Sequence, residues 1–190
     1  MKRIIVGMSG ASGVIYGIRL LEVLKEMNVE THLVVSGGAK ENIEIETNYT
    51  MEDVEGLADK VYSIKNLAAA ISSGSFRTDG MVIVPCSMKT LSGVAHSYNE
   101  NLLIRAADVA IKEKRKLILV VRETPFHSGH LRAMLEVSEM GGVILPPVPA
   151  FYHHPKSIDD LVNHIIGKIL DLLGIENSMF RRWAGENHSG

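Results

Sequence analysis

The sequence contains almost no cysteine and no long apolar run. Its 190 residues include one cysteine, Cys86, so no disulfide can form within the chain. A single cysteine suits a reducing compartment, which predicts a cytoplasmic protein. No apolar run approaches the roughly 20 residues that span a bilayer, and the first strand-like run begins at Arg3, which leaves no room for a signal peptide. We therefore expect neither secretion nor a membrane partner.

An excess of charge of one sign is also lacking. Twenty lysines and arginines face 22 aspartates and glutamates, which gives a formal net charge of -2 without a basic stripe. Nucleic-acid binding favours a basic surface, so we expect no nucleic-acid partner. With 46% hydrophobic and 22% charged residues, the chain is expected to form one globular domain over residues 1–190. A chain of this length can build a core without disulfides or structural metal.

Apolar strand-like runs alternate with helical patterns along the whole chain. The expected strands are Arg3–Met8, Thr31–Val35, Met81–Val84, Leu117–Val121 and Val143–Leu145. The expected helices are Val14–Met27, Gly38–Thr47, Lys89–His96, Asn101–Glu113, His130–Met140 and Ser157–Leu173. This alternation predicts βαβ units with a mostly parallel sheet between two helical layers, a Rossmann-like α/β three-layer sandwich.

One strand-to-turn junction is especially informative. The apolar run 81–84 is followed by Pro85, which is expected to end the strand because proline cannot continue the ladder of hydrogen bonds. Ser87 and Thr90 then lie outside the carboxyl end of this strand. Open α/β sheets bind ligands at that edge, where the following helix presents free N–H groups. We expect the chemistry of the protein at this turn.

The first strand leads into a glycine-rich turn. Residues 7–13 read Gly-Met-Ser-Gly-Ala-Ser-Gly, a spacing that differs from the dinucleotide fingerprint G-x-G-x-x-G. The second strand ends at Ser36 rather than at an acid that would hold a ribose, and the Walker pattern is absent. The turn is either a backbone nest for a phosphate or a planar ring, or a tight turn for close helix packing. Ser36 and Ser87, both just past strand ends, favour one shared crevice.

Several charged residues could meet at this crevice. Arg105 and Lys112 are seven residues apart on an expected helix, hence on one face and about 10 Å apart. Arg122 and Glu123 follow the next strand, and Lys168 lies in the last helix. Each alone reads as a solvated surface charge. Together they would form a phosphate-monoester site in which Glu123 donates or shuttles a proton.

Other reactive residues favour structural interpretations. His127 and His130, like the adjacent histidines 153 and 154, lack the cysteine or acid cluster that would complete a metal site, so no metal is expected. Cys86 reads as a small packed hydrophobe. Ser87 lacks the G-x-S-x-G elbow of a hydrolase. Residues 42–46 could form a solvated helix face, although Glu46 remains a candidate acid.

The chain resembles the UbiX-like flavin prenyltransferases, which include small subunits of phenolic-acid decarboxylase systems and have a flavodoxin-like fold. The matching blocks are residues 7–13, Ser-Gly-Ser-Phe-Arg-Thr-Asp-Gly-Met at 73–81, Pro-Cys-Ser at 85–87 with Thr90, Arg-Ala-Ala-Asp-Val at 105–109, Arg-Glu-Thr-Pro at 122–125 and Phe-Tyr-His-His-Pro at 151–155. They occur in the same order and span nearly the whole chain.

The resemblance implies transfer of a dimethylallyl group from dimethylallyl monophosphate to N5 and C6 of reduced FMN, without metal. The product, prenylated FMN, would serve a UbiD-like decarboxylase. The implied FMN-binding residues are Gly10, Ala11, Ser12, Ser36, Ser87, Thr90 and Arg122. The implied phosphate-binding residues are Arg105, Lys112, Arg122, Tyr152 and Lys168, with Glu123, Glu46 and Ser12 as catalytic residues. Some would reach in from neighbouring subunits of a homo-dodecamer, on which the tail from about residue 174 would pack.

Two features depart from the family pattern. Lys168 stands where relatives commonly carry arginine, and residues 130–134 read His-Leu-Arg-Ala-Met rather than His-Leu-Glu-Asn-Met. Two alternative functions also stay open. One is an FMN-dependent decarboxylase of peptidyl cysteine, whose Pro-Ala-Ser-Ala-Asn-Thr motif differs from Pro-Cys-Ser-Met-Lys-Thr here. The other is a non-catalytic FMN carrier subunit.

Overall fold

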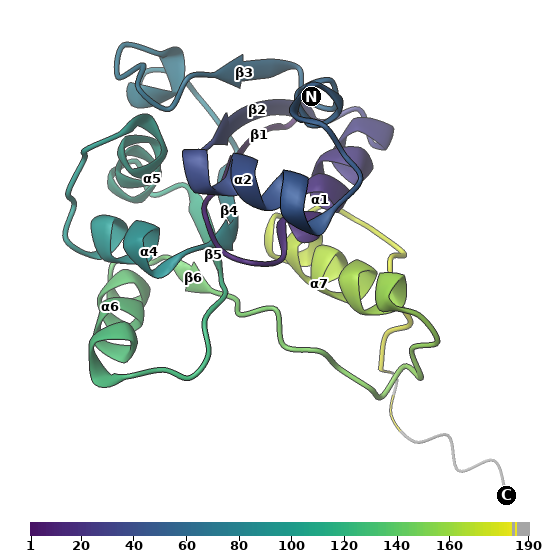
Figure 1. The fold of residues 1–190 in the computed structure, drawn as a ribbon. Coiled ribbons are helices and arrows are strands. Elements are labelled where there is room, and N and C mark those ends of the chain that lie inside the picture. The colour runs from purple at the N-terminus through teal and green to yellow at the C-terminus, as the bar shows by residue number, and fades with distance from the viewer. Residues whose placement is uncertain (184, 186–190) are drawn as a thin grey trace, which may run out of the picture. The chain divides into compact units, whose positions relative to one another are not determined.

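The computed structural model describes residues 1–183 and 185, and the chain divides into two compact units (Figure 1). The first unit is Met1–Pro147 and the second begins at Val148. One domain over residues 1–190 stays a prediction. The expected packing of the tail on a neighbouring subunit also stays a prediction, and residues 184 and 186–190 of that tail lie outside the described part. No described helix combines the length and the apolar character needed to cross a membrane.

A six-stranded parallel sheet forms the centre of the first unit, in the order β3-β2-β1-β4-β5-β6. The strands are β1 Arg3–Met8, β2 Glu30–Val35, β3 Lys60–Tyr62, β4 Gly80–Cys86, β5 Lys116–Val121 and β6 Val143–Ile144. Because all pairings are parallel, the carboxyl ends of the strands meet at one edge. β1 pairs with β2 on one side and with β4 on the other. The edge beside β1 is therefore the switch point where such sheets bind ligands.

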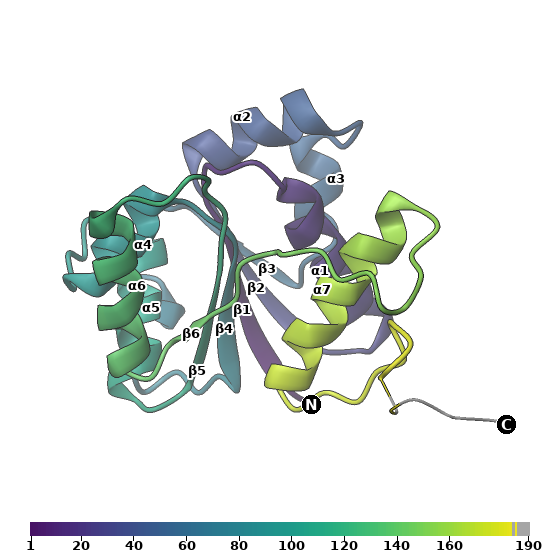
Figure 2. The same ribbon diagram turned by 90° about the horizontal axis from the view of Figure 1, so that it is seen from below.

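Helices cover both faces of this sheet. They are α1 Val14–Glu26, α2 Gly37–Glu46, α3 Met51–Glu55, α4 Met88–Ala95, α5 Leu102–Lys112 and α6 Ser128–Glu139, with a short 3-10 helix, η1, at Ala70–Ser72. Figure 2 shows α1 on one face and α4, α5 and α6 on the other. The predicted α/β three-layer architecture is confirmed.

Burial explains why the strands lack polar alternation. All seven residues of β4 are buried, and β1 is buried from Ile4 to Met8. A sheet covered on both faces needs apolar side chains on both, so its strands read as continuous apolar runs. The core on the α5 side includes Ile83, Leu103 and Leu119 from three different elements.

The expected end of the strand Met81–Val84 is wrong. β4 does not stop at Val84 but continues through Pro85 to Cys86. The pairing with β5 shifts register between Ile83 and Cys86, and such an irregularity accommodates a residue that has no N–H to donate. The strand therefore delivers Pro85 and Cys86 to the carboxyl edge.

The second unit is built around α7, Ile158–Leu172. A capping box begins this helix, because Ser157 accepts a hydrogen bond from the Asp160 N–H while the Asp160 carboxylate accepts one from the Ser157 N–H. The segment after α7 folds back on it. Arg182 donates two hydrogen bonds to the Asp171 carboxylate, at 2.7 and 2.8 Å. A bidentate pair of this kind fixes the returning segment against the helix.

Candidate functional site

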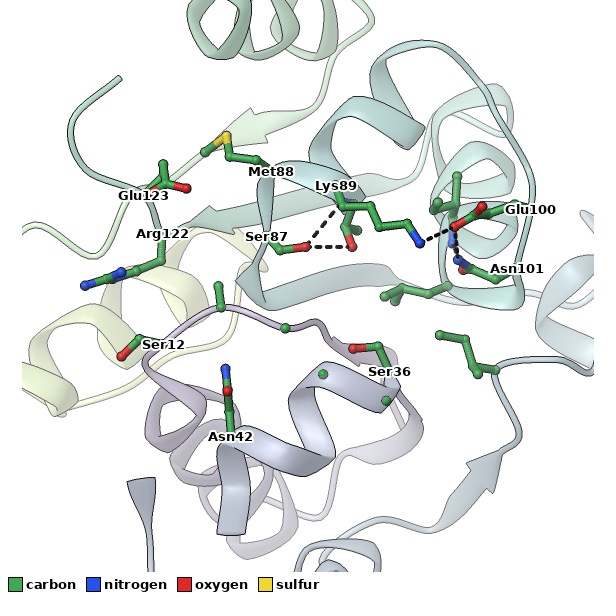
Figure 3. Close-up of a pocket in the computed structure, with 18 of the residues that line it drawn as sticks. Ser12, Ser36, Asn42, Ser87, Met88, Lys89, Glu100, Asn101, Arg122 and Glu123 are labelled. Carbon is green, nitrogen blue, oxygen red and sulfur yellow. Dashed lines mark hydrogen bonds and ion pairs between the residues drawn. The ribbon is translucent and has the colours of Figure 1, made fainter. Parts of the chain in front are cut away.

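A cavity of about 730 Å³ opens at the carboxyl edge of the sheet (Figure 3). Loops after β1, β2, β4 and β5 contribute its walls. The predicted site residues that line it are Gly10, Ala11, Ser12, Ser36, Glu46, Ser87, Thr90, Arg122 and Glu123. The remaining lining residues are Gly37, Gly38, Asn42, Ile64, Met88, Lys89, Glu100, Asn101, Leu103 and Ile104. The crevice predicted from strand ends is thus present.

Ser9 joins two of the loops that form this cavity. Its side chain is buried, and Oγ donates a hydrogen bond to the Pro85 carbonyl at 3.0 Å. The same oxygen accepts a hydrogen bond from the Ser87 N–H at 2.8 Å. The Ser9 N–H also donates to the Pro85 carbonyl, at 3.1 Å. These bonds hold the turn after β4 against the turn after β1 and thereby place Ser87.

Three helices begin at the cavity wall. Ser36, Ser87 and Asn101 are the N-caps of α2, α4 and α5, and their side chains accept hydrogen bonds from the N–H groups of Ala39, Thr90 and Ile104. The Ser87 hydroxyl also donates to Thr90 Oγ1 at 3.2 Å. Further N–H groups of each first turn lack intrahelical acceptors, and the helix dipoles add positive potential there. This part of the cavity suits an anion such as a phosphate.

The start of α1 is different, because a carboxylate of the protein already occupies it. Gly13, the N-cap, has φ 99° and no side chain to cap the helix. Instead, Glu46 Oε2 accepts hydrogen bonds from the N–H groups of Gly13 at 2.8 Å and Val14 at 3.4 Å. The first N–H groups of α1 are therefore already satisfied by a protein carboxylate, unlike the helix starts that Ser36, Ser87 and Asn101 cap.

Two glycines, one in the turn after β1 and one in the first turn of α2, allow a close approach beside the cavity. A Cβ atom on Gly10 would lie 3.1 Å from Cα of Gly38, and one on Gly38 would lie 3.2 Å from Cα of Gly10. Backbone atoms stand on both sides, so no flexible side chain can move aside. The turn of residues 7–13 is thus a packing turn, as one of its two interpretations predicts, and its role as a backbone nest for a ligand stays a prediction.

The two cationic side chains that line the cavity differ in whether they have an interaction partner. Within the described residues, the guanidinium of Arg122 has no hydrogen-bond or ion-pair partner and its side chain is exposed. Lys89 forms an ion pair with Glu100 at 3.1 Å across the rim. Arg122 is therefore the cation that is available to an anionic ligand without breaking an existing pair.

Glu123 follows Arg122 at the end of β5. Its Oε1 accepts a hydrogen bond from the Thr124 N–H at 2.9 Å, and the carboxyl group lines the cavity. Ser12 lines the wall that faces Arg122 in Figure 3. A carboxyl group beside an unpaired guanidinium can move a proton to an anion held there.

The other predicted phosphate ligands do not line this cavity. Arg105 donates to the Ser72 carbonyl at 3.2 Å and to Asp108 at 2.9 Å. Lys112 pairs with Glu113 at 2.7 Å. Tyr152 and Lys168 belong to the second unit, where the Tyr152 hydroxyl contacts His164. Their phosphate-binding roles stay predictions.

The structural interpretations of cysteine and histidine agree with the geometry. Cys86 is fully buried, and burial raises the pKa of its thiol far above the ordinary value, which disfavours the reactive thiolate. His127 caps α6 by accepting a hydrogen bond from the Gly129 N–H. Within residues 1–183 and 185, no three His, Cys, Asp or Glu side chains cluster as metal ligands.

Sequence reasoning missed several cavity residues. Asn42 lies one turn before Glu46 on α2 and points into the cavity in Figure 3. Asn101 directly precedes an apolar helical pattern, which is the usual position of an N-cap. Leu103 and Ile104 form an apolar wall together with Ile64. The helical spacing of Asn42 and Glu46 and the N-cap position of Asn101 could have identified both asparagines.

Comparison with known proteins adds to this geometry. Residues 1–170 match the family described as Flavoprotein. The chain is similar to flavin prenyltransferase UbiX of Thauera aromatica, with 58% identity over 183 residues that cover 96% of this chain and 94% of that protein. It is similar to the structure of AnUbiX (PadA1) in complex with FMN and dimethylallyl pyrophosphate, with 50% identity, a TM-score of 0.96 and coverage of 98% and 99% of the two chains. It also resembles a dodecameric FMN-dependent UbiX-like decarboxylase from Escherichia coli O157:H7, with 53% identity, a TM-score of 0.94 and coverage of 96% and 100%. A likeness to the FMN-dependent cysteine decarboxylase TvaF, at 12% identity and a TM-score of 0.65, concerns the fold alone.

Proposed function

The chain belongs to the Flavoprotein family, and from this premise we propose that it is a flavin prenyltransferase that transfers the dimethylallyl group of dimethylallyl monophosphate to N5 and C6 of reduced FMN. The observation that carries the proposal is the cavity at the switch point, where three capped helix starts and an unpaired arginine face one space. Reduced FMN supplies the electron-rich ring positions that accept the allylic group.

The residues of the cavity fit FMN. Ser36, Ser87 and Arg122 provide hydroxyls, free helical N–H groups and a positive charge for the FMN phosphate. Gly10 and Gly38 carry no side chains, so a ring can approach the backbone closely there. The apolar wall that includes Leu103 excludes water from one side. Gly10, Ala11, Ser12 and Thr90 complete the proposed FMN-binding set.

The proposed chemistry at the prenyl donor is electrostatic. The leaving phosphate gains negative charge as the allylic carbon loses electrons, and fixed cations stabilise this separation. Glu123 passes a proton to the leaving phosphate, while Ser12 and Glu46 line the reacting centre. Arg105, Lys112, Arg122, Tyr152 and Lys168 surround the phosphate. Lys168 offers a point charge rather than the bidentate fork of an arginine, which lowers its geometric selectivity.

The product implies a partner and an assembly. Prenylated FMN is released for a UbiD-like decarboxylase, and the enzyme is a homo-dodecamer, as its relative from E. coli O157:H7 is described. Two phosphate ligands, Arg105 and Lys112, lie away from the cavity of their own chain, which supports active sites shared between subunits. The single cysteine, which is buried, supports a cytoplasmic location.

The test is an anaerobic incubation of the purified protein with reduced FMN and dimethylallyl monophosphate, without added metal, followed by mass spectrometry of the released flavin. We expect a flavin that is heavier by one C5H8 unit. Glu123→Gln and Lys112→Ala should retain FMN binding and lose most turnover. Glu44→Gln on the exposed face of α2 and Lys40→Ala, which lie outside the cavity lining, are matched controls that should keep full activity.

The alternative functions predict other outcomes, one of which is measured with an added peptide substrate. A carrier subunit would bind FMN, leave it unmodified and tolerate both substitutions. A cysteine decarboxylase would also leave FMN unmodified but would release carbon dioxide from a peptide with a C-terminal cysteine. Unmodified FMN with the monophosphate donor, and again with the pyrophosphate donor, would contradict the prenyltransferase.

A further inference from the structure

In the second unit, a buried histidine contacts the hydroxyl of Tyr152, a residue proposed to bind the substrate phosphate. His164 Nε2 and Tyr152 Oη are 3.1 Å apart, within hydrogen-bond distance. His164 lies in α7 with 7% of its surface exposed, whereas Tyr152 is 42% exposed. The phenol ring therefore faces solvent while its hydroxyl is anchored from the protein interior. This geometry suits a phosphate-binding side chain whose hydroxyl must point in a fixed direction.

Aromatic neighbours fix both rings. The His164 ring stacks on His153, with centroids 5.0 Å apart and planes at 7°, and meets the edge of Phe180 at 4.6 Å. The Tyr152 ring contacts Trp183 edge-to-face at 6.1 Å. Edge-to-face and offset-stacked contacts are favourable geometries that restrict ring rotation. The hydrogen bond thus connects two side chains that have little freedom to turn.

The protonation state of His164 follows from its surroundings. Burial lowers the pKa of His164, and the nearby His153 and Lys168 lower it further. The imidazole is therefore neutral near pH 7 and carries one N–H. Its Nδ1 is buried and has no hydrogen-bond partner among the described residues. Because an orphaned buried N–H is rarer than an orphaned acceptor, we place the hydrogen on Nε2, where it faces Tyr152.

We propose that His164 is a positioning residue that donates its Nε2–H to Tyr152 Oη and so directs the phenol hydrogen to a phosphate oxygen of the prenyl donor. The inference rests on the proposed function and deepens it. A hydroxyl that accepts a hydrogen bond becomes a stronger donor, because consecutive hydrogen bonds polarise one another. Lys168 lies one helical turn beyond His164 and is exposed, so a cation stands on the same face of α7. Together these residues form a monophosphate subsite.

Four variants of the full-length oligomer test this role. His164→Phe keeps a ring but removes the N–H, and His164→Gln keeps an N–H that can reach Tyr152. Tyr152→Phe removes the hydroxyl, and a double variant combines it with His164→Phe. The matched control is His153→Phe, which keeps the stacked ring and removes nitrogens that have no partner. The measurements are kcat, KM for dimethylallyl monophosphate and Kd for FMN, with the melting temperature as a check on folding.

We expect His164→Phe to raise KM for the monophosphate about fivefold, the effect of roughly one hydrogen bond, without changing the Kd for FMN. His164→Gln should recover part of the loss, and His153→Phe should leave KM unchanged. In the double variant, KM should equal that of Tyr152→Phe alone, because His164 acts through the hydroxyl. A structural role would instead lower the melting temperature in both histidine variants and add to the effect of Tyr152→Phe.

Calorimetric titration of dimethylallyl monophosphate separates this inference from the proposed function. A wild-type protein that forms no prenylated flavin contradicts the prenyltransferase. If that protein still binds the monophosphate, and binding weakens in His164→Phe but not in His153→Phe, the subsite stands. Equal monophosphate affinity in wild type and His164→Phe, or no affinity in either, overturns the role of His164.

Discussion

At the scale of single residues, Ser9 shows how much of the site depends on a side chain that never faces the ligand space. Ser9 is 1% exposed and does not line the cavity. Its hydroxyl satisfies both the Pro85 carbonyl and the Ser87 N–H, two backbone groups at the end of β4. Ser87 in turn caps α4 at the proposed phosphate position. The position of a ligand-binding serine therefore depends on a buried one.

Ser9→Ala should lower both stability and FMN affinity. The substitution leaves the Ser87 N–H without its acceptor, and an unsatisfied buried donor costs about 1 to 3 kcal/mol. Thermal unfolding should report this loss, and flavin fluorescence titration should report a weaker FMN complex. Ser138→Ala, at an exposed position of α6, is the control that should change neither. Normal FMN affinity in Ser9→Ala would contradict the role assigned to the Ser9 bridge.

Residues of the candidate site could be predicted from the sequence where they follow strand ends, but less well where they form other parts of the cavity wall. Ser36, Ser87 and Arg122 were identified because each directly follows an apolar run. Ser9 also directly follows an apolar run, but that pattern does not reveal its role, because the role arises from contact with a loop 76 residues away in sequence. Glu46 was identified as an acid, but its hydrogen bonds to the start of α1 depend on the packing of α2.

At the scale of elements, the apolar pattern identified the buried strands and missed the exposed ones. β1, β4 and β5 are buried over almost their whole length and read as nearly continuous apolar runs, whereas β2 also buries the polar residues Thr31 and His32 before its apolar end. β3 is a three-residue edge strand in which Lys60 and Val61 are exposed, and α3 is a five-residue helix. Neither is long enough to show a period. β4 also extended past Pro85, because a register shift in the sheet removed the need for an N–H there.

The turn after β1 and the first turn of α2 meet at a glycine contact that can be tested with a neighbouring glycine as control. Gly38→Ala would place a methyl group 3.2 Å from Cα of Gly10, where only backbone could yield. We expect the loops after β1 and β2 to separate, which lowers the melting temperature and weakens FMN binding. Gly37→Ala meets no atom within 4 Å and lies in the first turn of α2. Its melting temperature should be equal or slightly higher, because alanine favours helix more than glycine does.

Both variants add one methyl group to the first turn of α2, so helix propensity should affect them similarly, and a difference in stability between them reports the contact with Gly10. Loss of stability in Gly37→Ala as well would contradict the specific contact with Gly10. An unchanged melting temperature in Gly38→Ala would mean that the two turns relax at little cost.

At the scale of the whole molecule, two of the proposed phosphate ligands lie outside the cavity lining of their own chain. The cavity of one subunit contains Glu123 and Arg122, whereas Arg105 and Lys112 lie on α5 outside its lining. No sequence pattern reports which chain supplies a residue to a site. An assembly in which α5 of one subunit reaches the cavity of the next would complete the cluster of cations.

Subunit complementation tests this arrangement directly. Lys112→Ala and Glu123→Gln are each expected to be nearly inactive, and the two chains are co-expressed with different tags so that mixed oligomers can be isolated. If Lys112 serves a neighbouring cavity, about a quarter of the sites in a randomly mixed oligomer combine an intact Glu123 from one chain with an intact Lys112 from another. Prenylation activity should then return to a comparable fraction of the wild-type value.

The matched control is the pair Ser87→Ala and Glu123→Gln, since Ser87 and Glu123 line the cavity of the same chain. In a mixture of these two variants, every cavity carries one of the two substitutions. Activity should therefore not recover beyond the level of the separate variants. Recovery in the first pair but not in the second places Lys112 in the site of a neighbouring subunit. Absence of recovery in both would mean that Lys112 acts within its own chain or not at the site, and the active site would then have to close around one subunit.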